Sequence, residues 1–239
     1  MTKSPQTSQV EVARWFDQTY ETRGFDYLRP LEAYPIFLQL LDAKPGRSLL
    51  DVACGPGLLL RAALMRGLEA TGVDISERAI EIARSYAEGT DARVGNVERL
   101  DFADESFDYV TCIGALERFL DRDRALAEIR RVARPDAKLC FMVRNASTLV
   151  WRVWHQWLRK QNREGHQDAQ SLEWWTTLFR ENGFAVEGVF MDQWGRQKLR
   201  KWLRGFRRHD FSKPEPIATP MFTIRNAFEF IFVLRKCDS

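Results

Sequence analysis

The segment Leu49–Gly57, LLDVACGPG, joins an apolar run to a glycine turn and leads directly into a helical pattern. Gly55 and Gly57 let the backbone bend tightly and approach a ligand with no β-carbon in the way. Asp74 follows in GVDIS at the end of the next apolar run, where a carboxylate can accept hydrogen bonds from both ribose hydroxyls. The turn and the carboxylate together predict a site for a nucleoside cofactor.

This turn differs from the turn of dinucleotide-binding folds. When Gly55 is counted as the first glycine, Leu60 occupies the position of the third. Asp51, just before the turn, would repel a pyrophosphate but attract the ammonium group of an amino acid. The segment therefore favours a nucleoside cofactor without a pyrophosphate, and it disfavours an NAD-dependent dehydrogenase.

Apolar runs alternate with helical patterns along the chain, which is typical of strand–helix units around a parallel sheet. The predicted strands are 48–53, 70–75, 92–97, 107–114, 137–144, 184–190 and 227–236. The predicted helices are 9–20, 31–41, 58–66, 76–88, 121–133, 147–161 and 171–181. Pro135 ends the helix at 121–133, and Asn182-Gly183 ends the helix at 171–181. We expect an N-terminal helical cap over 1–45 and one α/β domain over 46–239.

Further motifs follow in the order found in one known family. They are GVDIS, GNVERLDFADESFDYV, IGALERFLD, AEIRRVARPDAKL, ENGF and FEFIFVLRK. With them the chain resembles the class I methyltransferases that depend on S-adenosylmethionine (SAM). The resemblance is to the methyltransferase type 11 group, which includes bacterial enzymes of ubiquinone and menaquinone biosynthesis. It is close over 49–144 and looser elsewhere.

The resemblance implies a Rossmann-like α/β fold. Its seven-stranded, mostly parallel sheet would have the order 3-2-1-4-5-7-6, with the last strand antiparallel, helices on both faces and the N-terminal helical cap. It also implies SAM as the cofactor and S-adenosylhomocysteine (SAH) as the product.

Positions in the cofactor site are carried over from the family motifs. The methionine part of SAM would lie among Asp51, Ala53, Gly55 and Gly57. The ribose would bind Asp74, and the adenine would lie against Ile75, Asn96 and Val97. Gly114 would also line the site. Asn96 replaces the more common Asp, and its carbonyl can accept the same hydrogen bond from the adenine amino group. Arg118 stands where relatives often have His.

Catalysis of methyl transfer needs an in-line nucleophile, and orientation and desolvation supply most of the acceleration. A base helps only when the acceptor is a hydroxyl of high pKa. The candidates are His166, Glu117 and Tyr20, although each also fits a plain role as a loop, surface or packing residue. Tyr20 and Arg29 belong to the expected cap, where either is also a candidate for contact with the methionine carboxylate.

Composition fits one sizeable core, since the 239 residues are 45% hydrophobic and carry a formal net charge of +3. The four cysteines have no CxxC spacing, so we expect no metal site and reduced thiols in buried strands. Residues 1–9 are polar, without an apolar signal-peptide core, and no apolar stretch reaches membrane-spanning length. We expect a soluble, cytoplasmic protein, whose oligomeric state the sequence does not indicate.

Basic residues and tryptophans concentrate in the C-terminal third. Residues 144–210 contain 13 Lys or Arg against 7 Asp or Glu, and seven of the eight tryptophans lie within 151–202. A basic, Trp-rich helical insertion is expected around 195–226. Its helix 196–208 would cap an acceptor pocket or, less favoured, make peripheral contact with an anionic membrane.

The expected partner is a small-molecule acceptor of hydrophobic or acidic character, of the quinone, lipid or secondary-metabolite type. An RNA methyltransferase is a less favoured alternative, because only one basic patch and no separate RNA-binding domain are visible. A SAM-binding regulatory protein without turnover is a further alternative that the cofactor motifs leave open.

Overall fold

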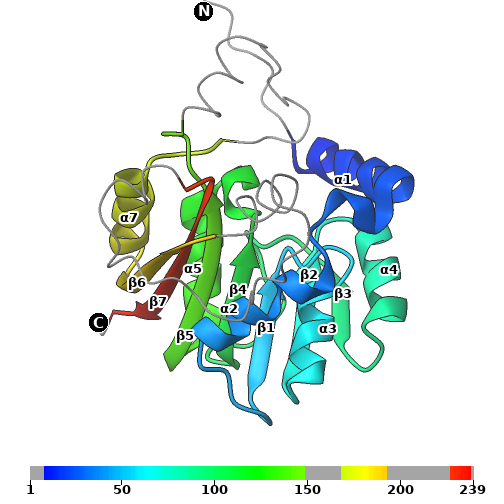
Figure 1. Ribbon diagram of the computed structural model, residues 1–239, viewed down its shortest axis with the longest axis horizontal. Helices are drawn as coiled ribbons and strands as arrows, with labels where there is room; N and C mark the ends of the chain where they lie inside the picture. The colour runs from blue at the N-terminus through cyan, green and yellow to red at the C-terminus, as the bar shows by residue number, and fades with distance from the viewer. Residues whose placement is uncertain (1–7, 149–167, 193–226, 238–239) are drawn as a thin grey trace, which may run out of the picture.

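The computed structural model describes residues 8–148, 168–192 and 227–237, and within them lies one seven-stranded sheet (Figure 1). Its strands are β1 (Ser48–Val52), β2 (Glu69–Asp74), β3 (Asp91–Val94), β4 (Phe107–Ile113), β5 (Ala133–Arg144), β6 (Phe184–Met191) and β7 (Glu229–Lys236). The strand order is β3-β2-β1-β4-β5-β7-β6. β1 to β5 pair in parallel, and β7 runs antiparallel to both β5 and β6. The predicted fold class and strand order are confirmed.

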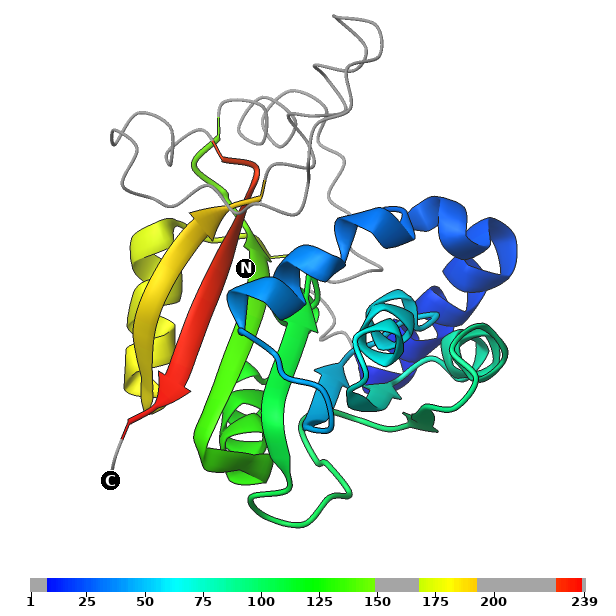
Figure 2. The ribbon, with the colours of Figure 1, turned by 60° about the horizontal axis from the view of Figure 1, so that its bottom comes forward.

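Helices cover both faces of this sheet (Figure 2). One face carries α2 (Pro35–Leu40), α3 (Leu58–Met65) and α4 (Glu77–Tyr86), and the other carries α5 (Arg122–Val132) and α7 (Leu172–Glu181). Leu49 and Leu50 of β1 are fully buried in opposite hydrophobic clusters, as the alternation of side chains along a strand requires. Burying a side chain of this size contributes about 1.5–3 kcal/mol. The sheet is therefore a rigid platform whose strand ends hold their residues in place.

The N-terminal segment forms α1 (Gln9–Arg23), two 3-10 turns, η1 (Gly24–Tyr27) and η2 (Leu31–Ala33), and then α2. The prediction of one helix over 31–41 is wrong, because Pro35 lacks an N–H and so begins a new helix at its first position. Asp17 docks α1 on the start of α4: its Oδ1 accepts a hydrogen bond from Ser76 Oγ at 2.6 Å. α1 thus covers the carboxyl ends of the first strands.

Two strand boundaries differ from the prediction by three residues or more. β3 ends at Val94 rather than at residue 97, because the chain turns at Asn96, which bridges to Arg99. β5 begins at Ala133, directly after α5, and its pairing with β4 shifts register between Phe107 and Tyr109. Pro135 lies in this irregular start of β5, where a missing N–H is tolerated. The helix before it does end ahead of Pro135, at Val132, as predicted.

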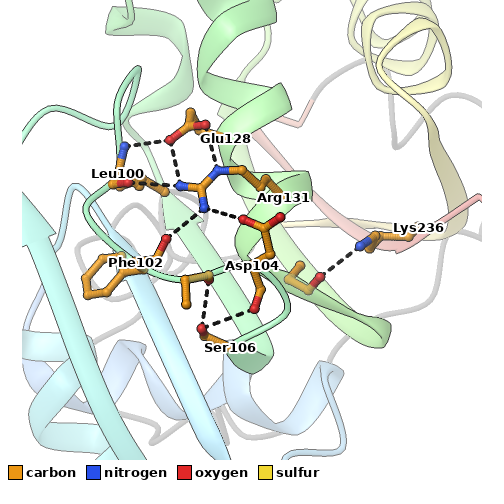
Figure 3. A network of polar contacts seen from close by, with 9 residues as sticks. Leu100, Phe102, Asp104, Ser106, Glu128, Arg131 and Lys236 are labelled. Atoms are coloured by element: carbon orange, nitrogen blue, oxygen red, sulfur yellow. Dashed lines mark hydrogen bonds and ion pairs between the residues drawn. The ribbon is translucent and has the colours of Figure 1, made fainter.

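Arg131 of α5 fixes the loop between β3 and β4 (Figure 3). Its guanidinium pairs with Glu128 and donates to the carbonyl oxygens of Leu100 at 2.9 Å and Phe102 at 2.7 Å. Asp104 of the same loop accepts from it at 2.7 Å, and Glu128 also accepts from the backbone N–H of Leu100. The loop that begins with Asn96 is therefore held at its far end by α5.

Three of the four cysteines, Cys54, Cys112 and Cys140, are buried free thiols, whereas Cys237 is exposed.

The basic, Trp-rich stretch around 195–226 and most of the helix expected at 147–161 lie outside the described residues. Among the helices that the structure does describe, none is long and apolar enough to cross a membrane. The division into a cap over 1–45 and a domain over 46–239 stays a prediction.

Candidate functional site

A cavity of about 340 Å³ opens at the carboxyl ends of the parallel strands, under α1. This is the edge of an open α/β sheet at which ligands bind, and the volume falls in the range of small-molecule sites. The cavity is lined by Asp51, Ala53, Gly55, Asp74, Ile75, Asn96, Val97 and Gly114. The structure therefore brings together eight of the nine residues predicted to contact the cofactor. Their contact with a cofactor stays a prediction.

The glycine turn has the predicted shape. Gly55 and Gly57 have positive φ angles of 53° and 83°, and Ala53 also adopts a left-handed conformation with φ of 57°. Gly57 is the ninth predicted residue and lies outside the cavity lining. A β-carbon at Gly57 would lie 3.1 Å from the Cβ of Ala83 in α4, so its lack of a side chain allows α3 to pack on α4.

Asp74 is buried and holds the glycine turn directly. Its Oδ2 accepts from the backbone N–H of Gly55 at 2.8 Å, and its Oδ1 accepts from the N–H of Ser76 at 2.9 Å. Burial raises the pKa of Asp74 to about 6, although these two N–H groups oppose the rise and Asp17 adds to it. Each oxygen keeps a second lone pair, so the carboxylate is oriented to accept two hydroxyl groups from the cavity.

Asp51 is the second buried carboxyl group of the cavity. Thr111 of β4 donates to its Oδ1 at 2.7 Å. Burial raises the pKa of Asp51 to about 7, while the Thr111 hydrogen bond lowers it and the charge of Asp74 raises it. Two acidic groups in one buried region favour a cationic ligand, because a positive charge would restore both to their ionised forms.

The adenine side of the predicted site is built from the end of β3 and the following loop. Asn96 Oδ1 accepts from the backbone N–H of Glu98 at 2.9 Å, which leaves its second lone pair for a ligand amino group. Val97 is buried in the hydrophobic core and also lines the cavity. Gly95, which sequence reasoning did not single out, lines the cavity too, and a β-carbon there would lie 2.7 Å from Cγ2 of Val73.

Tyr20 of α1 reaches over the glycine turn. A β-carbon on Gly55 would lie 2.9 Å from the Tyr20 hydroxyl, so the tyrosine covers the bend closely. Burial raises the pKa of Tyr20 well above its ordinary value, and the charge of Asp74 adds to this effect. The hydroxyl is therefore protonated at neutral pH, which suits a hydrogen-bond donor better than the base considered from the sequence.

Arg118 joins the cavity wall to the cap. Its Nη2 donates to the Tyr27 hydroxyl at 3.0 Å, and its guanidinium lies 5.5 Å and 5.3 Å from the ring centres of Trp15 and Phe16. Contacts of this kind stabilise a cation against aromatic faces. The residue that departs from the family pattern thus holds η1 and α1 against the sheet.

Glu117, the second catalytic candidate, is fully buried and does not line the cavity. Burial raises its pKa, and the positive charge of Arg144 opposes that rise. Its Oε1 lies 3.5 Å from Nε of Arg144, which is itself part of the cavity wall. The alternative reading of Glu117 as a surface residue is wrong, because η3 (Leu116–Arg118) turns it inward. His166, the third candidate, lies outside the described residues.

Arg29 links the cap to the far strands of the sheet. It pairs with Asp192 at 3.0 Å and with Glu229 at 2.8 Å, across separations of 163 and 200 residues. Burial raises the pKa of Asp192 to about 6, and the charge of Arg29 opposes the rise. Sequence reasoning assigned Arg29 to packing or to the methionine carboxylate, but it missed these two acidic partners, which carry no local signal in the sequence.

Comparisons with known proteins find similarity over part of this chain. Residues 50–141 match the model of a methyltransferase domain family. The ubiquinone biosynthesis O-methyltransferase of Alkalilimnicola ehrlichii is 35% identical over 139 residues, which cover 56% of each chain. The chain spans 56% and 61% of the length of two of the curated relatives that it matches.

Solved structures show the same fold at low identity. The SAM-dependent methyltransferase of Mesorhizobium loti superposes with a TM-score of 0.63 at 18% identity, over 86% of this chain and 98% of that one. The [4+2]-cyclase SpnF superposes with a TM-score of 0.67 at 17% identity, over 99% and 98%. Because the fold occurs with more than one chemistry, the residues of the site, and not the fold, determine the activity.

Proposed function

We propose that this chain, whose residues 50–141 match a methyltransferase domain family, is a class I SAM-dependent enzyme that transfers a methyl group from SAM to a hydroxyl group of a small aromatic acceptor. One observation carries the proposal. Asp51 and Asp74 line a single cavity, and Asp74 is oriented by the N–H of Gly55 in the glycine turn.

Each end of SAM finds a chemically suitable group. The ribose hydroxyls would donate to Asp74, and the ammonium of the methionine part would lie near Asp51. Asn96 and Val97 would contact the adenine, and Ile75 its face. The absence of a pyrophosphate in SAM agrees with the use of Leu60 rather than glycine in α3.

The acceptor is inferred from the other half of the cavity and from the relatives. Its wall contains the rings of Tyr27, Tyr34 and Phe119, which suit a planar, apolar molecule. The matched relatives are named as O-methyltransferases of ubiquinone biosynthesis, and this supports a hydroxyl of a quinone-type molecule as the methylated group.

When bound, SAM would supply an activated methyl group on a sulfonium, and its transfer to the acceptor hydroxyl would leave SAH and release the hydroxyl proton. The residues of the chain then have to orient the acceptor and exclude water. Tyr20 closes the cavity over Gly55, and Arg118 holds the cap in place through Tyr27. Orientation and desolvation of this kind supply a large share of the acceleration in bimolecular reactions.

Titration calorimetry with SAH and with NAD tests the cofactor assignment. We expect SAH to bind and NAD to give no heat. Asp74→Ala should weaken SAH binding about 100-fold, since two hydrogen bonds to a charged group are lost. Asp91→Ala, an exposed carboxylate at the start of β3, is the matched control and should bind like the wild type. Binding of NAD in place of SAH would contradict the assignment.

Incubation with radiolabelled SAM and a host extract tests the acceptor class. We expect the label in the small-molecule or lipid fraction. Label in RNA that is lost on nuclease treatment would support the RNA alternative. SAH binding without transfer to any fraction would support a protein that binds SAM without turnover.

A further inference from the structure

Arg144 is the last residue of β5, and it lines the cavity. Its Nε lies 3.5 Å from Oε1 of Glu117 and 3.6 Å from Oε1 of Glu229. The side chain is 34% exposed. Within the described residues its buried Nε has no hydrogen-bond partner, and the charges of the two carboxylates hold the guanidinium.

Glu117 explains why the guanidinium stays at the cavity wall. It is fully buried, and neither carboxylate oxygen has a hydrogen-bond partner within the described part of the chain. A buried carboxyl group without hydrogen bonds is costly, so its presence requires a role. The nearest basic group among its ion pairs is Arg144. Glu117 therefore acts as a fixed counter-charge behind Arg144.

The other basic groups of the described cavity wall are already engaged. Arg29 pairs with Asp192 and with Glu229, and Glu229 lies closer to Arg29, at 2.8 Å, than to Arg144. Arg118 donates to Tyr27 and lies against two aromatic rings. Arg144 is the arginine of the described wall whose terminal N–H groups remain available to a ligand.

We infer that Arg144 binds a carboxylate group of the acceptor, with Glu117 as the positioning residue that holds its guanidinium at the cavity wall. This inference rests on the proposed function, and it narrows the acceptor to a hydroxylated aromatic acid. A guanidinium offers two parallel N–H donors that match the two oxygens of a carboxylate. The aromatic rings of Tyr34 and Phe119 in the same cavity fit the ring that would carry both groups.

Calorimetry on the SAH complex tests this inference with two probes, 3,4-dihydroxybenzoate and catechol, which differ by the carboxylate alone. We expect 3,4-dihydroxybenzoate to bind at least about tenfold more tightly, as a charge-assisted hydrogen-bonded pair predicts. Arg144→Met should remove the preference, and Arg144→Lys should retain part of it, because lysine keeps the charge but not the fork. Glu117→Gln should reduce the preference without changing the affinity for SAH.

A control and a separate readout distinguish this inference from the proposed function. Arg93→Met, which removes an exposed arginine of β3, should leave the preference and the SAH affinity unchanged. Failure of the wild type to bind SAH overturns the proposed function and with it the inference. If SAH binds but both probes bind equally, or if the preference survives in Arg144→Met, the inference alone is overturned. Should Glu117→Gln fail to fold, the two Arg144 variants still decide the question.

Discussion

The affinity for SAH should depend on pH through Asp51. Burial raises the pKa of this carboxyl group to about 7, so in the empty site it is largely protonated at pH 6. Only the ionised form of Asp51 stabilises a bound ammonium group, so binding below pH 7 requires that Asp51 first lose its proton. With a pKa near 7, the ionised fraction is about 10% at pH 6.0 and about 75% at pH 7.5, which gives about eightfold tighter binding at the higher pH. Asp74, with a pKa of about 6, adds about a factor of two.

Titration calorimetry of SAH at pH 6.0 and 7.5 measures this dependence. The ammonium of the ligand remains mostly protonated over this range, because an α-amino group titrates near about 7.7–8.0. Asp51→Asn preserves the shape of the side chain and still accepts the Thr111 hydrogen bond. We expect this variant to bind nearly as well as the wild type at pH 6.0 but much more weakly at pH 7.5. Equal slopes for the two proteins would refute the role of Asp51.

The same shift makes a prediction for folding. An unfolded aspartate titrates near 3.9, whereas Asp51 in the folded protein titrates at about 7. Between these values the unfolded state binds fewer protons, so the contribution of Asp51 to the free energy of unfolding falls as the pH rises, by about 4 kcal/mol in all. SAH should offset this loss, so its stabilising effect in thermal unfolding should be larger at pH 7.5 than at pH 6.0. A ligand effect that shrinks over this range would contradict the reasoning.

Three further substitutions test other parts of the site. Asn96→Asp should bind SAH at least as tightly as the wild type in calorimetry, because an anionic oxygen is the stronger acceptor for the adenine amino group; a large loss would show that the amide donates instead. Gly55→Ala should weaken SAH binding about tenfold, since φ is positive and the new Cβ would lie 2.9 Å from the Tyr20 hydroxyl. Gly46→Ala shares a positive φ but meets no atom within 4 Å, and should leave the affinity unchanged. Arg131→Met should lower the thermal midpoint by about 5–10 °C, because losing its hydrogen bonds should reduce the free energy of unfolding by about 2–3 kcal/mol in a chain of this size. Arg124→Met on the same helix should leave the thermal midpoint unchanged.

The grouping of the proposed cofactor residues in one cavity could be predicted because its signals are local. The turn at Gly55 and the carboxylate of Asp74 each follow an apolar strand, and parallel strands place their carboxyl ends along one edge. The resemblance supplied the strand order, including the antiparallel β7. Asp51, Asp74 and the adenine loop therefore line one cavity, as the motifs indicated.

The contacts on the proposed acceptor side of the cavity could not be predicted, because they join distant parts of the chain. The ion pairs of Arg29 with Asp192 and Glu229 depend on how the cap folds back over β6 and β7. Glu117 follows an apolar strand and could equally have faced solvent on a surface helix, and the inward turn of η3 buries it. The break of the expected helix at Pro35 did have a local signal, since proline is favoured at the first position of a helix.

The position of β7 between β5 and β6 also sets the order in which the chain can complete its fold during synthesis. In the described sheet β6 pairs with β7 alone, so Phe184–Met191 emerges from the ribosome without a partner and remains so until Glu229–Lys236 has been made. A nascent chain therefore passes through a stage in which one strand is unpaired and one edge of β5 is open, the condition most prone to intermolecular strand pairing. β7 starts beside the cavity at Glu229 and runs away from it, so a tag fused behind Lys236 would leave the sheet at the end opposite the cavity. Truncation before Glu229 would remove an inner strand of the sheet and part of the cavity wall.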